Sequence, residues 1–442
     1  MAGEWVDCKL SDVCCSIDYG LTASAADHEN GPKFLRITDI VPGHIDWDTV
    51  PHVVADGKTT AKYKLHDGDI VLARTGASTG TSSYVKDPPP SVFASYLVRL
   101  KTAPEFDPRF VAYYLKSDKF WAFIRGVLGD KSAQPNASAT TMTAAPFRAP
   151  REKAEQRAIS HILGTLDDKI EVNRKMAATL EAMARALFQS WFVDFDPVRA
   201  KLDGRKPAGL DAATAALFPA HFQESPLGHI PQGWTIEPVG EVVECVGGGT
   251  PSTVEPKFWE GGTHRWTTPK DFSSLQAPIL LDTDRKITDA GIAKISSGLL
   301  PAGTLLLSSR APVGYLAIAA MPVAINQGFI AIKCNERASN FFMLNWCQTN
   351  MAEIESRATG TTFAEISKTN FRPILIVLPP KELMVAFTEK VAPLYEQVTA
   401  NLHQSRTLAT LRDTLLSKLL SGELRVAEAT IKRHLIVQDE GG

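Results

Sequence analysis

Apolar residues recur at spacings of three, four and seven along one stretch in the middle of the chain, and the same pattern returns near its C-terminal end. The first ladder contains Ile159, Leu163, Leu166, Ile170, Asn173, Leu180, Met183, Leu187 and Trp191. A shift of 228 positions carries it onto Phe387, Val391, Leu394, Val398, Asn401, Leu408, Leu411, Leu415 and Leu419. Such spacing, sustained over about 30 residues, is typical of coiled-coil helices. The pattern therefore predicts two long helices of the same kind.

Each ladder has one polar position, and the two coincide, because Asn173 lands on Asn401. A single asparagine in an apolar seam fixes the register of paired helices at some cost in stability. We predict that the ladders pair with each other, through Ile159, Leu163, Leu166, Ile170, Asn173, Leu180 and Leu187 on one side and Val391, Leu394, Val398, Asn401, Leu408, Leu411 and Leu415 on the other. A chain built twice in this way is suited to contacting two copies of something at a fixed separation.

A stretch of mixed α and β character precedes each ladder. In the first, short β-type runs at 34–40, 69–73 and 92–100 are followed by a helical pattern at 109–128, and Pro150 closes the stretch. In the second, β-type runs at 304–308, 315–319 and 329–332 precede a helical pattern at 340–356. The predicted fold class is α+β, with two globular domains and two long antiparallel helices in an internal repeat.

The chain thus divides into six segments. We assign 1–150 to the first globular domain, 151–195 to the first long helix, 196–233 to a linker, 234–379 to the second globular domain, 380–424 to the second long helix and 425–442 to a tail. The linker is rich in proline and glycine, but it holds an apolar island at 217–222. We therefore expect it to pack against another part of the protein.

Composition places the chain among ordinary globular proteins, at 44% hydrophobic and 22% charged residues. The longest apolar runs are too short for a transmembrane helix, and Glu4, Asp7 and Lys9 stand where a signal peptide would need an apolar core, so we expect a cytoplasmic protein. Six cysteines form no metal-binding pattern, which predicts reduced thiols and no metal. The net charge of −2 leaves nucleic-acid binding open, provided that basic residues cluster or a partner supplies backbone contacts.

Known catalytic motifs are missing from the sequence. Neither G-x-G-x-x-G nor G-x-x-x-x-G-K-[ST] occurs where a nucleotide would need it. Asp87–Pro90 resembles an amino-methyltransferase signature, but Pro90 replaces the aromatic residue that would stack on a flipped base. Glu255–Lys257 resembles the end of a nuclease motif without an upstream partner. We therefore predict no catalytic residues.

Polar loops remain, and they recur at matching points of both globular domains. Arginine and lysine pair with guanine edges, asparagine and glutamine pair with adenine, and hydroxyl groups position phosphates. The candidate DNA-binding residues are Lys33, Arg36, Thr38, Arg74, Thr75, Ser78, Thr79, Ser95, Tyr96, Arg99, Lys131, Gln134 and Asn136, and then Arg265, Thr267, Lys270, Asp271, Ser308, Ser309, Arg310, Tyr315, Asn326, Gln327, Thr361, Thr362 and Lys368.

At these loops the sequence resembles the specificity subunit of type I restriction-modification systems. The resembling stretches are Leu307–Gly314, Ala324–Phe329, Arg265–Asp271, Ser190–Pro197, Leu217–Trp234 and Leu419–Leu424. The resemblance implies two target recognition domains, each reading half of a split DNA sequence, held apart by an antiparallel helix pair. It implies no catalytic activity, and partners that comprise double-stranded DNA, two methyltransferase subunits and restriction or motor subunits. S-adenosylmethionine, ATP and Mg²⁺ would then be cofactors of those partners alone.

Two departures from the family pattern stand out. Arg74-Thr75-Gly76 replaces the Ser-Ser-Arg-Ala-Pro pattern of the second domain, which indicates that the two domains differ in sequence preference. Leu383–Val385 stand where the first helix has Glu155-Gln156, a pair common in the family. A helix of about 40 residues spans roughly 60 Å, more than one turn of B-DNA, so the helices are long enough to place two domains in successive major grooves.

Two other functions stay open at this point. One is a DNA methyltransferase or nuclease with an unrecognised active site, for which S-adenosylmethionine binding by the isolated chain would be evidence. The other is a protein-binding scaffold of a related phage-defence system, which a partner-bound protein without salt-dependent DNA binding would favour.

Overall fold

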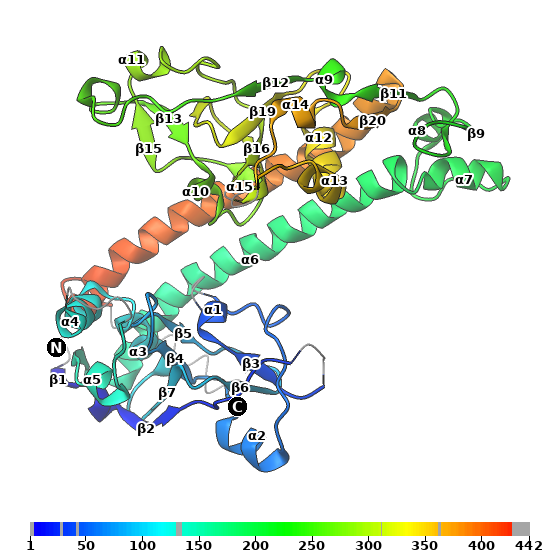
Figure 1. The fold of residues 1–442 in the computed structure, drawn as a ribbon. Coiled ribbons are helices and arrows are strands. Elements are labelled where there is room, and N and C mark those ends of the chain that lie inside the picture. The colour runs from blue at the N-terminus through cyan, green and yellow to red at the C-terminus, as the bar shows by residue number, and fades with distance from the viewer. Residues whose placement is uncertain are drawn as a thin grey trace. The chain divides into compact units, whose positions relative to one another are not determined.

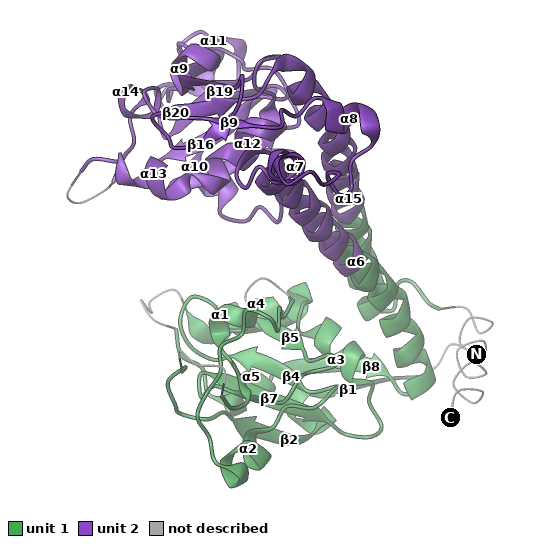
Figure 2. Cartoon of the chain, turned by 90° about the vertical axis from the view of Figure 1, so that its right-hand side faces the viewer, with its two compact units in different colours: residues 1–170, 407–442 green, residues 171–406 purple. Residues whose placement is uncertain are grey.

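The computed structural model describes residues 4–26, 30–40, 44–129, 135–310, 312–360 and 364–426. The chain divides into two compact units (Figure 2), unit 1 from residues 1–170 and 407–442 and unit 2 from residues 171–406. Each unit holds one α+β head and a part of each of two long helices. We call residues 4–150 head 1 and residues 234–379 head 2.

Head 1 is built around a four-stranded sheet of order β2-β7-β4-β5, with the parallel pair β3-β6 beside it (Figure 1). The first and last strands of the head form the antiparallel pair β1-β8. Its strands are β1 (Trp5–Lys9), β2 (Cys14–Tyr19), β3 (Lys33–Leu35), β4 (Ile70–Ala73), β5 (Ser82–Tyr84), β6 (Ser91–Phe93), β7 (Leu97–Thr102) and β8 (Pro146–Pro150). Its helices are η1 (Leu10–Val13), α1 (Ile37–Ile40), α2 (Gly57–Tyr63), α3 (Pro108–Tyr114), α4 (Asp118–Leu128) and α5 (Ala139–Thr143).

Head 2 repeats this plan with a larger sheet of order β12-β19-β16-β17-β14, a three-stranded sheet β15-β13-β18 and the pair β11-β20. Its strands are β11 (Thr235–Pro238), β12 (Glu244–Gly247), β13 (His264–Thr267), β14 (Ile279–Leu280), β15 (Arg285–Ile287), β16 (Leu305–Ser309), β17 (Val313–Ala319), β18 (Val323–Ile325), β19 (Phe329–Lys333) and β20 (Leu375–Leu378). Its helices are α9 (Val239–Val242), η2 (Pro256–Phe258), α10 (Pro269–Phe272), α11 (Asp289–Ile292), α12 (Asn340–Thr349), α13 (Met351–Ser356) and α14 (Lys368–Phe371).

The register of the strands shows that the two heads are copies of one topology. The order β2-β7-β4-β5 corresponds to β12-β19-β16-β17, and the parallel pair β3-β6 corresponds to the parallel pair β13-β18. The pairs β1-β8 and β11-β20 both join the start of a head to its end. The predicted α+β class and internal repeat are therefore confirmed.

The long helices are α6 (Lys153–Phe192) and α15 (Lys381–Ser421). They pair antiparallel within each unit: in unit 1 Asp167 bonds Arg412, and in unit 2 Phe192 contacts Phe387. Both helices belong to the cores of the heads. In unit 1 the core of head 1 includes Ile159 and Leu163, and in unit 2 the core of head 2 includes Ala184 of α6 and much of α15. Apolar burial against a head stabilises each helix half more than its intrinsic propensity does.

The two seam asparagines meet in unit 2. Asn173 Nδ2 donates to Gln404 Oε1 at 2.8 Å and to the Asn401 carbonyl oxygen at 3.5 Å, and Gln397 Nε2 donates to Asn401 Oδ1 at 2.9 Å. Both asparagines are buried. Within the described residues, Asn173 Oδ1 and Asn401 Nδ2 make no hydrogen bond. The layer favours one register, because a shift that placed an apolar side chain in the position of Gln404 would take a hydrogen-bond acceptor from the buried amide of Asn173.

The other predicted pairing residues vary in burial. Ile159, Leu163, Val391 and Val398 are buried, whereas Leu411 is 46% exposed. Leu166, Ile170, Leu180, Leu187, Leu394, Leu408 and Leu415 are partly buried. Met183, the ladder position equivalent to Leu411, is likewise 54% exposed. One layer of each ladder thus lies at the edge of the seam.

Several predicted elements are shorter than expected, and polar caps explain the breaks. The helix expected at 109–128 is two helices, because Ser117 caps the N-terminus of α4, where its Oγ accepts from the Phe120 amide. The strand expected at 34–40 ends at Leu35, because Asp39 accepts from the Arg36 amide and starts α1. The strand expected at 92–100 is β6 and β7, separated by a turn. The helix expected at 340–356 is α12 and α13, which meet at Asn350.

The linker folds onto head 2 and α6, as its apolar island predicts. It contains α7 (Asp196–Leu202), α8 (Ala212–Ala216), β9 (Phe222–Gln223) and β10 (Ile230–Pro231). Phe218 is 2% exposed, and its ring lies 5.2 Å from that of Trp191 at the end of α6. The linker is therefore part of the core of unit 2.

Arg109 of head 1 forms hydrogen bonds with α6 at Gly164 and Asp168. Its Nη2 donates to the Gly164 carbonyl oxygen at 3.1 Å and to Asp168 Oδ1 at 3.0 Å. A Cβ atom at Gly164 would lie 2.4 Å from Cζ of Arg109. The guanidinium therefore lies flat on the helix only because position 164 has no side chain.

We expect Gly164→Ala to lower the free energy of unfolding by about 1 kcal/mol, because losing the Arg109 contacts outweighs the gain in helix propensity. The matched control is Gly126→Ala in α4, where a Cβ atom would meet nothing within 4 Å. That change should raise the free energy of unfolding by about 0.5–1 kcal/mol. Urea denaturation measures both, and a stabilised Gly164→Ala protein would contradict the assigned role of Arg109.

Candidate nucleic-acid interface

In head 1 the ends of several strands meet at one place. The amide of Leu21 donates to the Phe93 carbonyl oxygen at 2.8 Å, the amide of Ala94 donates to Leu35 at 2.9 Å, and the amide of Arg74 donates to Tyr96 at 3.1 Å. The amide of Ala137 donates to the Arg74 carbonyl oxygen at 3.0 Å. We call residues 19–21, 35–39, 74–79, 94–96 and 135–137 loop cluster 1.

The same hydrogen bonds recur in head 2. Gly249 donates to Ile325 at 2.9 Å, Asn326 to Thr267 at 3.1 Å, Ser309 to Gly328 at 2.8 Å and Ile366 to Ser309 at 3.0 Å, amide to carbonyl oxygen in each case. We call residues 247–249, 267–271, 309–310, 326–328 and 364–366 loop cluster 2. The two sets of bonds align the clusters residue by residue.

A glycine crosses each cluster at the same point. A Cβ atom at Gly20 would lie 2.3 Å from the carbonyl oxygen of Ala94, and one at Gly248 would lie 2.0 Å from that of Ile325. Either clash is with backbone, which has little freedom to move. The close approach of the two loops therefore requires glycine at both positions.

The structure brings some of the predicted DNA-binding residues into these clusters with accessible side chains. Asn136, Tyr96 and Thr38 are exposed in cluster 1, and Gln327 is exposed in cluster 2. Arg74, Thr75, Ser78, Ser95, Arg310 and Asn326 are partly buried there. Lys368 is exposed next to cluster 2, two residues after Ile366. Lys131, Gln134, Thr361 and Thr362 lie outside the described residues.

Five predicted residues are buried: Thr79, Arg99, Thr267, Ser308 and Ser309. The side chains of the first four form hydrogen bonds within the protein. Arg99 donates to Asp18 Oδ2 at 2.8 Å and to the Lys64 carbonyl oxygen at 2.7 Å. Ser308 Oγ donates to the Pro312 carbonyl oxygen and accepts from the Tyr315 amide. For the residues buried in this way the structure indicates a role in holding strands and turns.

Of the other predicted basic residues in or beside the clusters, Arg36, Arg265 and Lys270 each have a carboxylate partner. Arg36 Nη2 lies 2.9 Å from Asp39 Oδ1, Arg265 Nε lies 2.9 Å from Asp282 Oδ1, and Lys270 Nζ lies 3.9 Å from Asp284 Oδ2. Lys33 instead donates to the Val50 carbonyl oxygen at 2.9 Å. Asp271 accepts from the Thr268 amide and caps α10.

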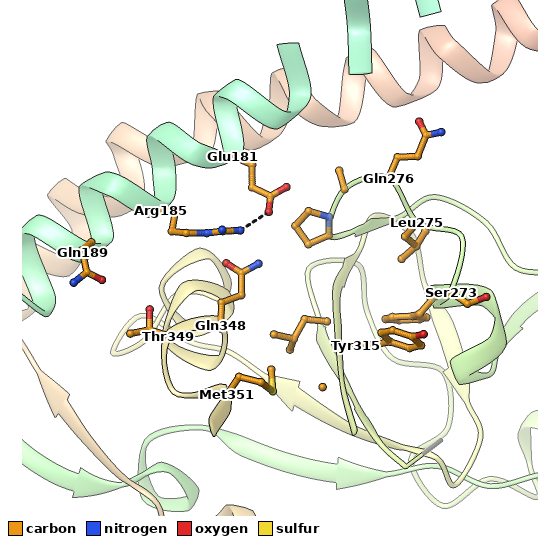
Figure 3. A pocket seen from close by; sticks show the side chains of 15 residues that line it. Glu181, Arg185, Gln189, Ser273, Leu275, Gln276, Tyr315, Gln348, Thr349 and Met351 are labelled. Atoms are coloured by element: carbon orange, nitrogen blue, oxygen red, sulfur yellow. Dashed lines mark hydrogen bonds and ion pairs between the residues drawn. The ribbon is translucent and has the colours of Figure 1, made fainter. Parts of the chain in front are cut away.

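Tyr315 lies away from these loops. It lines a cavity of about 740 Å³ between α6 and head 2, opposite Gln348 and below Glu181 and Arg185 (Figure 3). Glu181 Oε1 lies 2.9 Å from Arg185 Nη2, and burial raises the pKa of Glu181. The lining of this cavity contains Tyr315 but none of the residues that define loop clusters 1 and 2.

Two cluster residues were not predicted from the sequence, Tyr19 and Glu365. The ring of Tyr19 lies 4.9 Å below the guanidinium carbon of Arg74, and Tyr19 is 45% exposed. Glu365 Oε2 lies 3.7 Å from Arg310 Nη1. Tyr19 directly precedes Gly20, whose repeat at Gly248 is the sequence signal that could have identified this site.

Asp282 connects head 2 to α15 within unit 2. It accepts from Arg265 Nε and from Arg406 Nη2, both at 2.9 Å. Burial alone would raise the pKa of Asp282, but the hydrogen bonds from the two guanidinium groups lower it to about 2. The ionised carboxylate therefore stabilises the folded state at every pH above the ordinary carboxyl range.

We expect Asp282→Asn to lower the free energy of unfolding at pH 7 by about 1 kcal/mol, a value reduced by solvent screening because the side chain is 36% exposed. Since the folded pKa is below the unfolded one, this contribution is complete above about pH 4 and is lost as the pH falls toward 2. Urea denaturation of both proteins at several pH values should show the gap closing. Asp284→Asn, at an exposed neighbour, should change stability by less than about 0.5 kcal/mol.

Neither a metal site nor a membrane span was found in the described part of the chain. It contains no cluster of three or more His, Cys, Asp or Glu residues that could hold a metal ion. Its helices include none that is long and apolar enough to cross a membrane.

Comparison with known families gives a match over most of the chain. The model described as "Type I restriction modification DNA specificity domain" matches twice, at residues 2–182 and 231–401. The first match contains head 1 and most of α6, and the second contains head 2 and about half of α15. The matches therefore follow the internal repeat that the strand topology shows.

Individual relatives agree with this match. The type I restriction enzyme HindI specificity subunit of Haemophilus influenzae is 26% identical over 95% of this chain and 100% of its own length. The MjaIX specificity subunit of Methanocaldococcus jannaschii is 34% identical over 36% of this chain and 38% of its own length. The crystal structure of the type I restriction-modification S subunit from M. genitalium has a TM-score of 0.53 at 15% identity, over 94% of this chain and 96% of that one, and supports the same fold.

Proposed function

The chain belongs to the type I restriction-modification DNA specificity family, and we propose that it directs two methyltransferase subunits, and restriction or motor subunits, to a split DNA sequence. It is the non-catalytic DNA-recognition subunit of such a complex, with one recognition domain in each half of the repeat. The single observation that carries this function is the twofold match of the family model to two heads with the same topology.

The loop clusters contain side chains that are suited to recognising DNA bases. Clusters 1 and 2 place Arg, Asn, Gln and Tyr side chains where strand ends meet, and these are the side chains that reach base edges or stack on bases. Equivalent backbone hydrogen bonds hold both clusters, so the two heads present different side chains from the same backbone arrangement. This arrangement suits a bipartite target whose halves differ in sequence.

The proposed methyltransferase subunits would account for the near-zero net charge of the chain. Phosphate contacts supply much of the affinity of DNA-binding proteins, yet the chain has a net charge of −2, and basic residues in or beside the clusters, such as Arg36 and Arg265, have acidic partners. We propose that methyltransferase subunits enclose the DNA together with this chain and supply backbone contacts. S-adenosylmethionine, ATP and Mg²⁺ would bind those partners, and the complex would act in the cytoplasm, where the host DNA lies.

Methylation mapping tests this function. The chain is co-expressed with the methyltransferase subunit encoded beside it, and adenine methylation is mapped across the host genome by long-read sequencing. One split motif is expected, and replacing head 2 (residues 234–379) with that of another family member should change one half-site and leave the other intact. A well-formed complex without any motif would contradict DNA reading by the heads and favour a protein-binding scaffold.

A further inference from the structure

Equivalent positions of the two loop clusters carry side chains of different size and charge. The shared hydrogen bonds align Arg74 with Ser309, Tyr96 with Gly328 and Asn136 with Glu365. Isolated bridges place Thr75 opposite Asn136, and Arg310 opposite Glu365, so Thr75 aligns with Arg310. Each cluster therefore has one arginine just after its central strand, but at neighbouring positions of the loop.

In cluster 1 two side chains, those of Tyr19 and Asn136, hold the guanidinium of Arg74. Its guanidinium carbon stacks 4.9 Å from the Tyr19 ring, and its Nη2 donates to Asn136 Oδ1 at 3.3 Å. The hydroxyl of Tyr19 accepts from the Ala139 amide at 3.0 Å, which keeps the ring in place. Arg74 Nε is buried. The backbone amide of Arg74 donates to the carbonyl oxygen of Tyr96, whose side chain is 60% exposed. The orientation of the guanidinium is thus set before any ligand arrives.

In cluster 2 the space is organised differently. Gly247 and Gly328 stand at the positions of Tyr19 and Tyr96, so no ring can support an arginine there. A Cβ atom at Gly247 would lie 3.3 Å from Lys368 Nζ, so a lysine occupies that side of the cluster. Arg310 instead has the carboxylate of Glu365 3.7 Å away, and both side chains are more than a third exposed. The contact with Glu365 is at Nη1, and the Arg310 side chain is 36% exposed, so part of the guanidinium is accessible to a ligand.

We infer that Arg74 in head 1 and Arg310 in head 2 each read a guanine in one half-site, and that Asn136 and Glu365 are positioning residues that aim the two guanidinium groups. Guanine presents the acceptors O6 and N7 in the major groove, and the planar guanidinium fork matches both. The inference rests on the proposed function and adds to it the base read and the residues responsible. Because the arginines stand one loop position apart, the guanine sits at a different place in each half-site.

The experiment measures methylation of a DNA library in which each position of the wild-type motif is randomised in turn, using the purified complex with the methyltransferase subunit. Arg74→Gln should relax the requirement for one guanine in one half-site, and Arg310→Gln should relax one guanine in the other. The loss of discrimination should be roughly 10- to 100-fold at that position, the range for a bidentate arginine–guanine contact. All other positions should keep their preference.

The positioning role has its own readout. Glu365→Gln keeps the size of the side chain and removes its charge, so it should partly relax the same guanine as Arg310→Gln. Arg74→Lys and Arg310→Lys keep the charge without the fork, and they should relax the same positions even if a glutamine variant folds poorly. Arg148→Gln and Arg337→Gln are the matched controls, because these arginines pair with Asp7 and Glu237 beside the β1-β8 and β11-β20 strands. Both should leave the motif unchanged.

The outcomes separate the two levels of the proposal. A wild-type motif whose guanines stay equally required in all arginine variants would overturn the inference and leave the recognition function standing. A motif without a guanine in either half-site would do the same. No methylated split motif with the wild-type complex would overturn the proposed function, and the inference with it.

Discussion

Phe387→Ala is expected to lower the free energy of unfolding by about 3–5 kcal/mol, because it removes a fully buried aromatic ring. Phe387 is completely buried, and its ring lies 4.9 Å from that of Phe192, 6.0 Å from Trp191 and 6.4 Å from Phe342. These rings come from both long helices and from α12 of head 2. Alanine would leave a cavity between three elements that cannot all close on it.

Urea denaturation followed by tryptophan fluorescence measures this change, because Trp191 belongs to the same cluster. Phe387→Leu, which fills part of the cavity, should cost about 1–2 kcal/mol. Val385→Ala in the same helix, at a side chain 43% exposed, should change stability by less than about 0.5 kcal/mol. Equal losses for the Phe387→Ala and Val385→Ala variants would show that the aromatic cluster does not hold unit 2 together.

Asp167→Ala should lower the free energy of unfolding by about 2–4 kcal/mol, because it leaves Lys116 and the Nη1 side of the Arg412 guanidinium largely buried without a carboxylate. Asp167 accepts from Tyr113 Oη at 2.6 Å and from Arg412 Nη1 at 2.7 Å, and Lys116 Nζ lies 3.9 Å away. Burial alone would raise the pKa of Asp167, but Lys116, Tyr113 and Arg412 together lower it. This carboxylate therefore joins head 1, α6 and α15 within unit 1.

The matched control is Asp413→Asn. Asp413 contacts the same arginine, with Oδ1 2.7 Å from Arg412 Nη2, but its side chain is 62% exposed. Its loss should cost less than about 0.5 kcal/mol. Urea denaturation at pH 7 measures the free energy of unfolding of both variants. A small loss at both positions would mean that the Asp167 cluster contributes little to the stability of unit 1.

The long helices could be predicted from the sequence because their pattern is local and repeated. The ends of the short helices in the heads depended on single caps such as Ser117 and Asp39, which a hydrophobicity pattern does not show. Pattern also failed to separate Val92–Leu100 into two strands, because the turn between them contains no proline or glycine. Apolar periodicity thus predicted which segments form elements better than it predicted where each element ends.

The candidate site was predictable as a set of loops but not as a set of side chains. Ser308 and Ser309 occur in a polar stretch, yet backbone groups of the hairpin satisfy Ser308 inside the sheet. Glu365 was missed because an acidic residue has the wrong sign for a phosphate contact, and its partner Arg310 is 55 residues away in sequence. The roles of such residues depend on tertiary pairing, which spacing along the chain does not contain.

Trp5 and Trp234, at the starts of the two heads, each lie against the end of a long helix. Phe192, at the end of α6, contacts Trp234 just before β11, with ring centroids 5.9 Å apart. At the equivalent place in unit 1, the guanidinium carbon of Arg425, just after α15, lies 5.3 Å from the ring centroid of Trp5 in β1. In both units, therefore, a tryptophan at the start of a head lies against the end of a long helix. In unit 1 this contact joins segments from opposite ends of the described chain, so the two ends stabilise each other there.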